Sequence, residues 1–254
     1  MSYIRPRPTR GALVAAAIAS CLASAGAQAQ APTPTLAPFS AAQAAQPPAA
    51  WRPVGLPPGK APLAQMDIAP LDGARVLRLR TDASYGTLVH AVDGWSPAAG
   101  ATLQWRWRLE QAVAGADLRR KDGDDAALKV CVMYDLPLDK VPFVERNLLR
   151  LARSVSGELL PAATVCYLWD STLPAGTALP NAYSRRVRFL VLDGAAEAPG
   201  TWRPHQRQIH ADFLRLFGDE SSTVPPVLAV AVGADADNTG ARSLAYIGDI
   251  RLLP

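Results

Sequence analysis

The chain has 254 residues, 49% of them apolar and 7% aromatic, with 26 Lys and Arg against 22 Asp and Glu. No stretch reaches the roughly 18 consecutive apolar residues of a membrane-spanning helix, so no transmembrane segment is predicted. Three of the 26 basic residues, Arg5, Arg7 and Arg10, lie in the leader described next, and without them 23 basic residues face 22 acidic ones. This near-neutral balance argues against a nucleic-acid-binding protein, which needs a surplus of Lys and Arg.

The N-terminus has the three parts of an export signal. A basic start precedes an apolar stretch over residues 12–23, and small residues follow up to Ala27. We therefore predict a signal peptide over residues 1–27 and a periplasmic or secreted protein. The alternative is a lipoprotein, because the residues that end at Cys21 resemble a lipoprotein box in which this cysteine would carry the lipid.

The composition changes after the leader. Residues 28–50 are rich in Ala, Pro and Gln. Such a segment buries too little apolar surface to offset the entropy of ordering it, so we predict a tether with a first ordered contact at Trp51. Residues 51–254 then form a single domain, long enough for one sizeable core.

Period-two alternation of apolar and polar residues dominates residues 51–254. In residues 103–109, for example, Leu and Trp alternate with Gln and Arg. The predicted strands are 74–80, 86–92, 103–109, 127–134, 163–169, 186–192, 202–210, 227–232 and 243–252. Short strands without helices between them predict an all-β fold, an antiparallel β-sandwich of jelly-roll type.

Two helices are expected among these strands. Residues 143–155 place Val144, Leu148 and Leu151 at helical spacing, with arginines on the other face and Gly157 as the stop. We expect this helix to pack on a sheet with its basic face in water; the alternative is a membrane-surface role. A shorter helix is predicted over residues 211–217.

Two cysteines remain after the leader, Cys131 and Cys166. In an oxidising compartment they can form a disulfide worth about 3–4 kcal/mol. The alternative is that both are free thiols buried as small apolar residues, since each lies in an apolar strand.

The charged run that follows the Trp-Arg strand ends in Asp124 and Asp125, directly before the strand at 127–134. These carboxylates would meet the polar face that carries Arg106 and Arg108, and guanidinium–carboxylate pairs can hold the hydroxyl groups of a sugar. We predict a saccharide site there, with Trp169 as a stacking aromatic. The alternative is a charged hairpin connection, for which Asp-Gly is a strong signal.

A second acidic segment resembles the first half of a calcium loop. Asp235 and Asp237 alternate before a glycine, but the twelfth position falls on Tyr246 and offers no carboxylate. A structural calcium site could be completed by Asp249. The alternative is ordinary turn chemistry, which favours the same residue types.

Motifs of catalysis give little support for an enzyme. The sequence contains no Gly-x-Ser-x-Gly, no His-Glu-x-x-His and no phosphate-binding glycine loop. Glycoside hydrolysis needs only two suitably spaced carboxylates, for example Glu110 with Asp124 or Asp170, and their separation is a structural quantity. We therefore favour a protein that is not an enzyme, and glycoside hydrolysis is the alternative.

Several sequence blocks, in this order, resemble a family of bacterial exported proteins. They begin with Trp-Arg-Trp at 105–107 and end with a Gly-Asp-containing block, and they comprise 105–107, 115–117, 121–125, 166–170, 173–177, 180–183, 186–188, 235–240 and 246–250. The family is known as a domain of unknown function, number three thousand and forty-seven. The resemblance implies export and implies no activity. Residues 245–252 are also similar to the closing strand of galactose-binding-like carbohydrate-binding modules, which favours the sandwich fold more than any ligand.

Taken together, these features favour a non-catalytic module that binds an envelope polysaccharide or other glycan. The alternatives are a glycan-acting hydrolase with paired carboxylates and a periplasmic scaffold or assembly protein whose partner is another protein. No cofactor is expected, apart from the calcium considered above.

Overall fold

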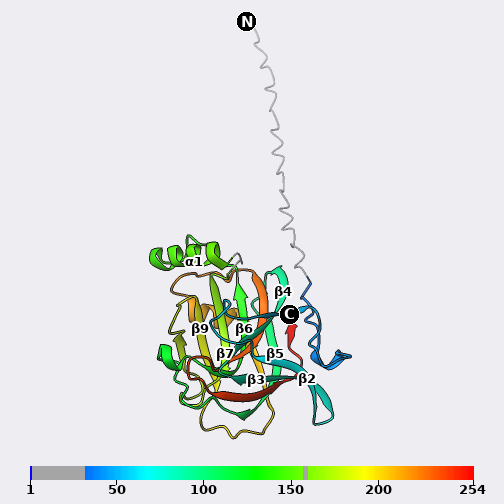
Figure 1. Cartoon of the computed structure of the whole chain (residues 1–254). Helices are drawn as coiled ribbons and strands as arrows, with labels where there is room; N and C mark the ends of the chain where they lie inside the picture. Colours follow the sequence, from blue (N-terminus) through cyan, green and yellow to red (C-terminus); the bar gives the residue numbers. More distant parts are fainter. Residues whose placement is uncertain (2–31, 157–159) are drawn as a thin grey trace. The chain divides into compact units, whose positions relative to one another are not determined.

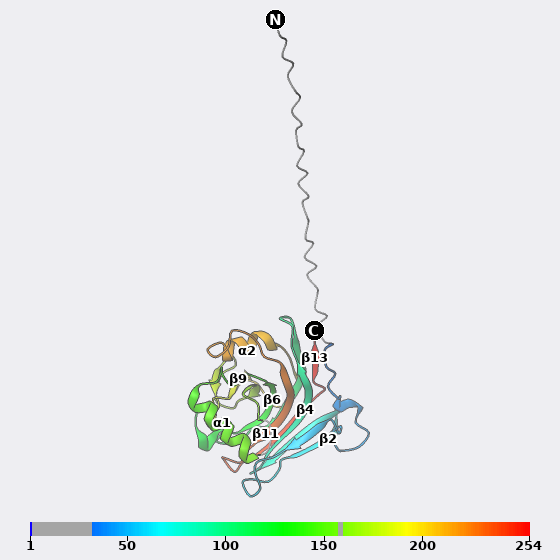
Figure 2. The same cartoon turned by 90° about the horizontal axis from the view of Figure 1, so that it is seen from above.

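Two β-sheets contain most of the ordered chain (Figures 1 and 2). The computed structural model describes residues 1, 32–156 and 160–254. The signal peptide predicted over residues 1–27 lies, apart from Met1, outside the described residues, and so do Cys21 and Gly157. None of the helices described is long and apolar enough to cross a membrane.

The first sheet has seven strands. Their order is β1 (Trp51–Val54), β4 (Tyr85–Trp95), β11 (Val227–Asp235), β6 (Ala126–Tyr134), β7 (Ala163–Trp169), β9 (Val187–Asp193) and β8 (Ala178–Pro180). All neighbouring strands are antiparallel except β7 and β9, which are parallel. The chain runs through β8 between these two strands, which gives it the length that a parallel crossover requires.

The second sheet has five strands in one path and a sixth at its side. The order is β10 (Arg203–Gln208), β5 (Thr102–Gln111), β12 (Arg242–Ile247), β3 (Ala74–Asp82) and β2 (Gln65–Leu71), with β13 (Arg251–Leu253) paired to β5. In Figure 1 the labelled strands of the first sheet stand upright, and β3 and β2 run across them at a steep angle.

The core lies between the two sheets. Along β5, Leu103, Trp105, Trp107 and Leu109 are buried, and the residues between them point away from the core. Facing them, β7 is buried along its whole length, and Tyr167 packs against Trp105 with ring centroids 5.3 Å apart. The predicted all-β sandwich is thereby confirmed, with antiparallel pairing throughout except at β7 and β9.

Each predicted strand corresponds to a strand of the structure, with two changes. The strand predicted over 202–210 ends at Gln208 because α2 (Ile209–Phe217) begins there. The strand predicted over 243–252 is divided into β12 and β13 by a break at residues 248–250. Three further strands, β1, β2 and β8, were not predicted; β1 and β2 contain proline, and β8 has three residues.

The segment predicted to be a tether packs on the domain from Leu36 onward. Leu36 and Phe39 are buried, and the Phe39 ring lies 4.9 Å from the ring of Trp51. The indole N–H of Trp51 donates to the carbonyl of Ala37 at 2.8 Å, and the Ala37 N–H donates to His90 Nε2 at 3.1 Å. The side chains of Leu36 and Phe39 thus hold on the domain a segment whose average composition predicts an unfolded tether.

Helix α1 (Phe143–Ser156) forms where the periodicity predicts it, but it faces the opposite way. Val144, Leu148 and Leu151 are 62–68% exposed, whereas Leu149 on the other side of the helix is buried. The expectation that the apolar face packs on a sheet is therefore wrong. The reason is that Glu145, on the polar side, is paired with Arg186 of the domain.

Strands β6 and β7 are joined covalently. Cys131 and Cys166 lie directly opposite each other in the register of these two strands, and they form a disulfide with an S–S distance of 2.02 Å. Of the two alternatives left by the sequence, the structure contains the disulfide.

Candidate ligand-binding site

The five residues predicted to bind a saccharide do not form one site. Arg106 and Arg108 project from the outer face of β5 in the second sheet, whereas Asp124 and Asp125 precede β6 in the first sheet. Within the described residues, no hydrogen bond or ion pair joins the two arginines to the two aspartates. Trp169 is 4% exposed in the core, so its ring offers no surface on which a ligand could stack.

Asp124 and Asp125 hold loops together. The side-chain amide of Asn181 donates to Asp124, and the backbone N–H groups of Asn238 and Thr239 donate to Asp125 at 3.2 and 2.7 Å. Burial, together with the nearby charge of Asp235, raises the pKa of Asp124 to about 6. Both carboxylates are buried and engaged by the protein itself, which indicates a structural role.

Asp125 also belongs to an aspartate cluster with Asp235 and Asp237, in which one carboxylate oxygen from each residue lies within 4.8 Å of the other two. Asp235 accepts hydrogen bonds from the Ala126 N–H at 2.7 Å and from Lys129 Nζ at 2.6 Å. Burial lowers the pKa of Lys129, but the charge of Asp235 outweighs this effect and keeps the pKa above its ordinary value. The lysine therefore supplies one positive charge beside the three carboxylates.

Asp249, the third residue of the predicted calcium site, lies elsewhere. Its carboxylate accepts hydrogen bonds from the N–H and the hydroxyl of Ser40 at 2.9 and 2.7 Å. Ser40 belongs to a short 3₁₀ turn, η1 (Phe39–Ala41). The structure thus brings Asp235 and Asp237 together with Asp125 and leaves Asp249 on the second sheet.

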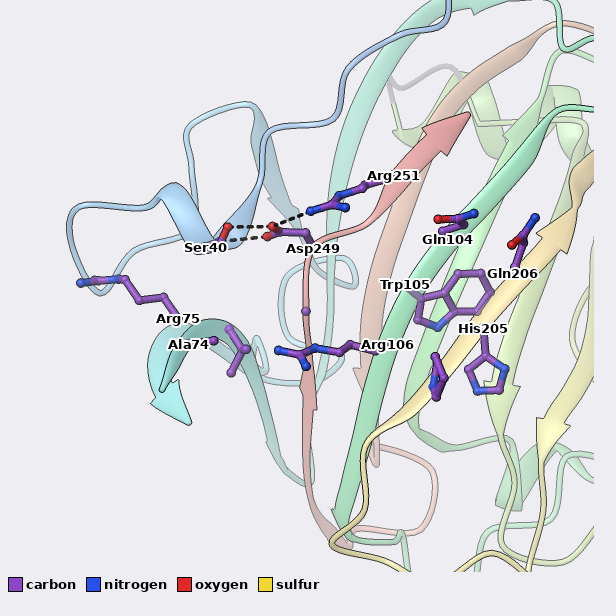
Figure 3. Close-up of a pocket in the computed structure, with 13 residues that line it drawn as sticks. Ser40, Ala74, Arg75, Gln104, Trp105, Arg106, His205, Gln206, Asp249 and Arg251 are labelled. Atoms are coloured by element: carbon purple, nitrogen blue, oxygen red, sulfur yellow. Dashed lines mark hydrogen bonds and ion pairs between the residues drawn. The ribbon is translucent and has the colours of Figure 1, made fainter. Parts of the chain in front are cut away.

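A pocket of about 480 Å³ opens beside Asp249 on the outer face of the second sheet (Figure 3). Its walls come from β5, β10, the start of β3 and the connection between β12 and β13. The polar residues of its lining are Ser40, Arg75, Gln104, Arg106, His205, Gln206, Asp249 and Arg251.

The pocket exists because β12 stops early. Ile247 pairs with Trp107 of β5, and pairing resumes only at Arg251, which lies opposite Gln104. Between these points the N–H of Gly248 donates to the Arg106 carbonyl at 2.9 Å. A Cβ atom at position 248 would approach Arg106 Cγ to 3.1 Å, so glycine leaves room for the arginine side chain to cross the break.

Arg106 is the free cation of this face. Within residues 32–156 and 160–254 its guanidinium makes no ion pair and donates no hydrogen bond, whereas Arg108 is paired with Glu110 and with Asp72. The guanidinium carbon of Arg106 lies 4.7 Å from the centre of the Trp202 ring. The Trp202 indole is held in turn by a hydrogen bond to Asp72 at 2.8 Å, so an oriented aromatic ring lies beside the unpaired charge.

A rigid network lies behind the pocket. His205 Nε2 is 2.9 Å from a carboxylate oxygen of Asp193, which also accepts hydrogen bonds from Trp107 Nε1 at 2.6 Å and Arg203 Nε at 2.7 Å. Burial raises the pKa of Asp193, but the hydrogen bonds from His205, Trp107 and Arg203 outweigh it and hold the pKa below its ordinary value. The charged carboxylate thereby fixes three side chains behind the binding surface.

Sequence reasoning identified Arg106 and missed most of its neighbours. The alternation of β5 was sufficient to place Gln104 on the same outer face as Arg106. The contact between Asp249 and Ser40 joins residues 209 positions apart, and no local pattern in the sequence predicts it. The same holds for Trp202, whose position depends on how β10 pairs with β5.

The fold and the pocket define a β-sandwich domain with a polar hollow on one sheet. The family model described as "Protein of unknown function (DUF3047)" matches residues 49–251. The chain therefore belongs to the DUF3047 family, as the sequence blocks indicated. A search of curated proteins gives no match.

Three solved structures are similar to parts of the chain, all at low sequence identity. The Endo-D glycoside hydrolase domain from Streptococcus pneumoniae R6 matches with a TM-score of 0.33 and 8% identity over 80% of this chain and 21% of that one, so this chain spans about a fifth of its length. The cellulose induced protein Cip1 matches with a TM-score of 0.35 and 11% identity, over 80% of this chain and 90% of Cip1. The K3 cleaved adhesin domain of Lys-gingipain from Porphyromonas gingivalis W83 matches with a TM-score of 0.32 and 11% identity, over 81% of this chain and 92% of the adhesin domain.

Proposed function

We propose that this protein is a non-catalytic glycan-binding module of the cell envelope and that its ligand occupies the pocket on the second sheet. The observation that carries the proposal is the unpaired guanidinium of Arg106, held beside the Trp202 ring at the wall of a polar hollow. This site replaces the one predicted around Asp124 and Trp169. It keeps Arg106, while Arg108 serves as a paired neighbour on the same face.

The chemistry of the lining suits a sugar. Hydroxyl groups donate and accept hydrogen bonds, and the amides of Gln104 and Gln206 can do both. Arg106 adds donors, and the Trp202 ring, which contacts Arg106 beside the pocket without lining it, holds that guanidinium in place. The volume of about 480 Å³ falls within the range of small-ligand sites.

The charge of the lining favours an acidic saccharide. Three guanidinium groups, those of Arg75, Arg106 and Arg251, line the pocket with the single carboxylate of Asp249, which is bound by Ser40 and lies 3.9 Å from Arg251, so positive charge remains in excess. Arginine pairs well with carboxylate and phosphate groups because its planar donors match two acceptor oxygens. We therefore extend the proposal to a glycan that carries uronic acid or phosphate groups.

Binding is better supported than hydrolysis. A glycosidase of the usual kind needs two carboxyl groups across one bond, and the residues that line the pocket include one. The other acids considered for this role are engaged elsewhere, since Glu110 is paired with Arg108 and both Asp124 and Asp170 are buried.

Export to the periplasm or beyond is part of the same proposal. It is supported by the leader sequence and by the Cys131–Cys166 disulfide, a bond typical of oxidising compartments. Fractionation of cells that produce the tagged chain tests it, and recovery from the cytoplasm in unprocessed form would contradict it. Incorporation of labelled fatty acid, lost in Cys21→Ser, would indicate the lipoprotein form.

The proposed site is tested by measuring binding of acidic and neutral oligosaccharides calorimetrically. A charge-assisted hydrogen bond contributes about 1.5–3 kcal/mol. We therefore expect Arg106→Gln to weaken the binding of an acidic oligosaccharide by about 10- to 100-fold. The matched control is Arg80→Gln, an exposed arginine of the same sheet outside this pocket, which should bind as the wild type does. Equal affinity of Arg106→Gln and wild type, or no binding of any saccharide, would refute the site.

A further inference from the structure

Helix α1 presents an apolar surface that nothing in the described chain covers. Phe143, Val144, Leu148 and Leu151, hereafter the α1 apolar face, are 62–68% exposed, and they account for half of the large apolar side chains that the described residues expose. Val144, Leu148 and Leu151 recur at the spacing of one side of a helix. Figures 1 and 2 both show α1 at the periphery of the domain.

The polar side of α1 is the side that binds the domain. Glu145 is paired with Arg186, and Arg185 Nε lies 3.4 Å from the same carboxylate. Farther along the helix, Arg153 Nε donates to the Leu160 carbonyl at 2.8 Å. Leu149 is the one fully buried side chain among those described in the helix. The orientation is thus fixed by ionic contacts, and turning the apolar side inward would break them.

The anchor itself is preorganised. Arg186 is buried in the domain, where it also pairs with the buried Glu220 at 2.6 Å. A buried ion pair that loses one partner leaves an uncompensated charge, so this contact resists rearrangement. The domain therefore holds the α1 apolar face outward in a fixed orientation rather than leaving the helix free to roll.

Charge identifies the occupant. The helix carries three arginines and a single acid, Glu145, which is neutralised by Arg186. Lys140 and Arg150 are exposed near the apolar face, and Arg185 extends close to Glu145 with most of its side chain in water. A second copy of this helix would bring like charges together. An apolar face bordered by cationic side chains on a short helix matches the surface of an anionic bilayer.

We propose that α1 docks the protein on an anionic phospholipid surface, with the α1 apolar face in the boundary between headgroups and acyl chains. The helix lies in the plane of the interface, and its exposed arginine, Arg150, meets the lipid phosphates together with Lys140. Fourteen residues with four large apolar side chains give reversible binding, not an integral anchor. This inference concerns a different surface from the saccharide pocket and does not depend on it.

Cosedimentation of the full chain with vesicles tests the proposal. One set of vesicles contains phosphatidylglycerol and phosphatidylethanolamine, and the other contains phosphatidylcholine alone. We expect wild-type protein to bind the anionic vesicles, more weakly at high salt, and the double variant Leu148→Ser/Leu151→Ser to bind them about tenfold more weakly or worse. Arg150→Glu should also weaken binding to the anionic set.

The matched control is Leu63→Ser, which removes a leucine that is 50% exposed outside α1 and should leave vesicle binding unchanged. All variants share the same N-terminal leader, so its contribution cancels, and equal melting temperatures confirm that each one folds. Binding that the double variant retains, or absence of binding by wild type, would overturn the proposal. A wild-type dimer that the double variant converts to monomer would assign the face to a second copy instead. Arg106→Gln should bind vesicles normally, which separates this proposal from the saccharide site.

Discussion

Replacing Asp193 by asparagine removes the carboxylate at the centre of the network behind the pocket and leaves the charge of Arg203 without its partner, and we expect this to lower the free energy of unfolding by about 3 kcal/mol. The Asp193 carboxylate is 3% exposed and accepts hydrogen bonds from three side chains, those of Trp107, Arg203 and His205. Asparagine keeps one acceptor oxygen and turns a donor group toward the remaining donors. At least one buried donor is then left without a partner.

The magnitude follows from what each donor loses. A hydrogen bond to a charged group contributes about 1.5–3 kcal/mol, and a buried donor left unpaired costs a similar amount. Trp107 is fully buried and cannot turn to water, whereas the Arg203 side chain is partly exposed and can be rehydrated. Trp107 and His205 share one carboxylate oxygen and Arg203 binds the other, so the amide oxygen can serve only one side; weaker, uncharged bonds to Trp107 and His205 together with loss of the ion pair to Arg203 give the expected value.

The effect should depend on pH. Because the folded protein holds the pKa of Asp193 below its ordinary value, the stabilisation is fully present above the pKa of the unfolded chain, about 4. It is lost as the pH falls through the lower pKa of the folded state. The difference between wild type and Asp193→Asn should therefore shrink in strong acid.

Urea unfolding followed by circular dichroism and tryptophan fluorescence measures this difference, with coincident transitions as the check for two-state behaviour. The control is Asp67→Asn, which removes a partly exposed carboxylate paired with Arg78 on the outer face and should cost less than about 1 kcal/mol. The reasoning is refuted if Asp193→Asn costs no more than Asp67→Asn at neutral pH.

Three further results are expected. Replacing Cys131 and Cys166 together by alanine should lower the unfolding free energy by up to about 4 kcal/mol, because the disulfide closes a loop over a separation of 35 residues; an unchanged urea midpoint would contradict this. The pKa of Asp124 in the folded protein is raised to about 6, so the free energy of unfolding of the wild type should rise as the pH falls from about 6 towards 4. The rise should be about 1 kcal/mol after allowance for partial solvation. Urea titrations at the two pH values should show that Asp124→Asn abolishes it. Because Lys129 already pairs with Asp235 and backbone N–H groups already bind Asp125, calcium or EDTA should leave the melting temperature unchanged, and a rise of several degrees with calcium would establish a metal site.

The sequence predicted the strands well because their signal is local. Strand β7 was located to the residue, and the inward and outward sides of β5 follow directly from alternating Trp and Arg. Periodicity also located α1, but it could not give the direction in which the helix faces. That direction depends on the pair of Glu145 with Arg186, two residues whose proximity only the folded chain creates.

The candidate site was predicted in part for the same reason. Arg106 could be identified because alternation places it on the polar side of a strand. Trp169 and Trp202 are both tryptophans at the end of a strand-like segment, and the sequence does not show which of them is buried. Only the packing of the sheets makes Trp169 a core residue and Trp202 a neighbour of Arg106. The tether was misjudged because composition averages over a segment, whereas Leu36 and Phe39 act as individual side chains.

The hydrogen bonds between Ser40 and Asp249 have a consequence for how the pocket on the second sheet forms. One side of the pocket combines two segments that are distant in the sequence, because Ser40 lies against Asp249 and Arg251. A variant truncated before Asp249 keeps most of the buried residues of the sandwich but lacks this side of the recess. The recess can therefore form only after both segments have been synthesised and have met in the folded domain.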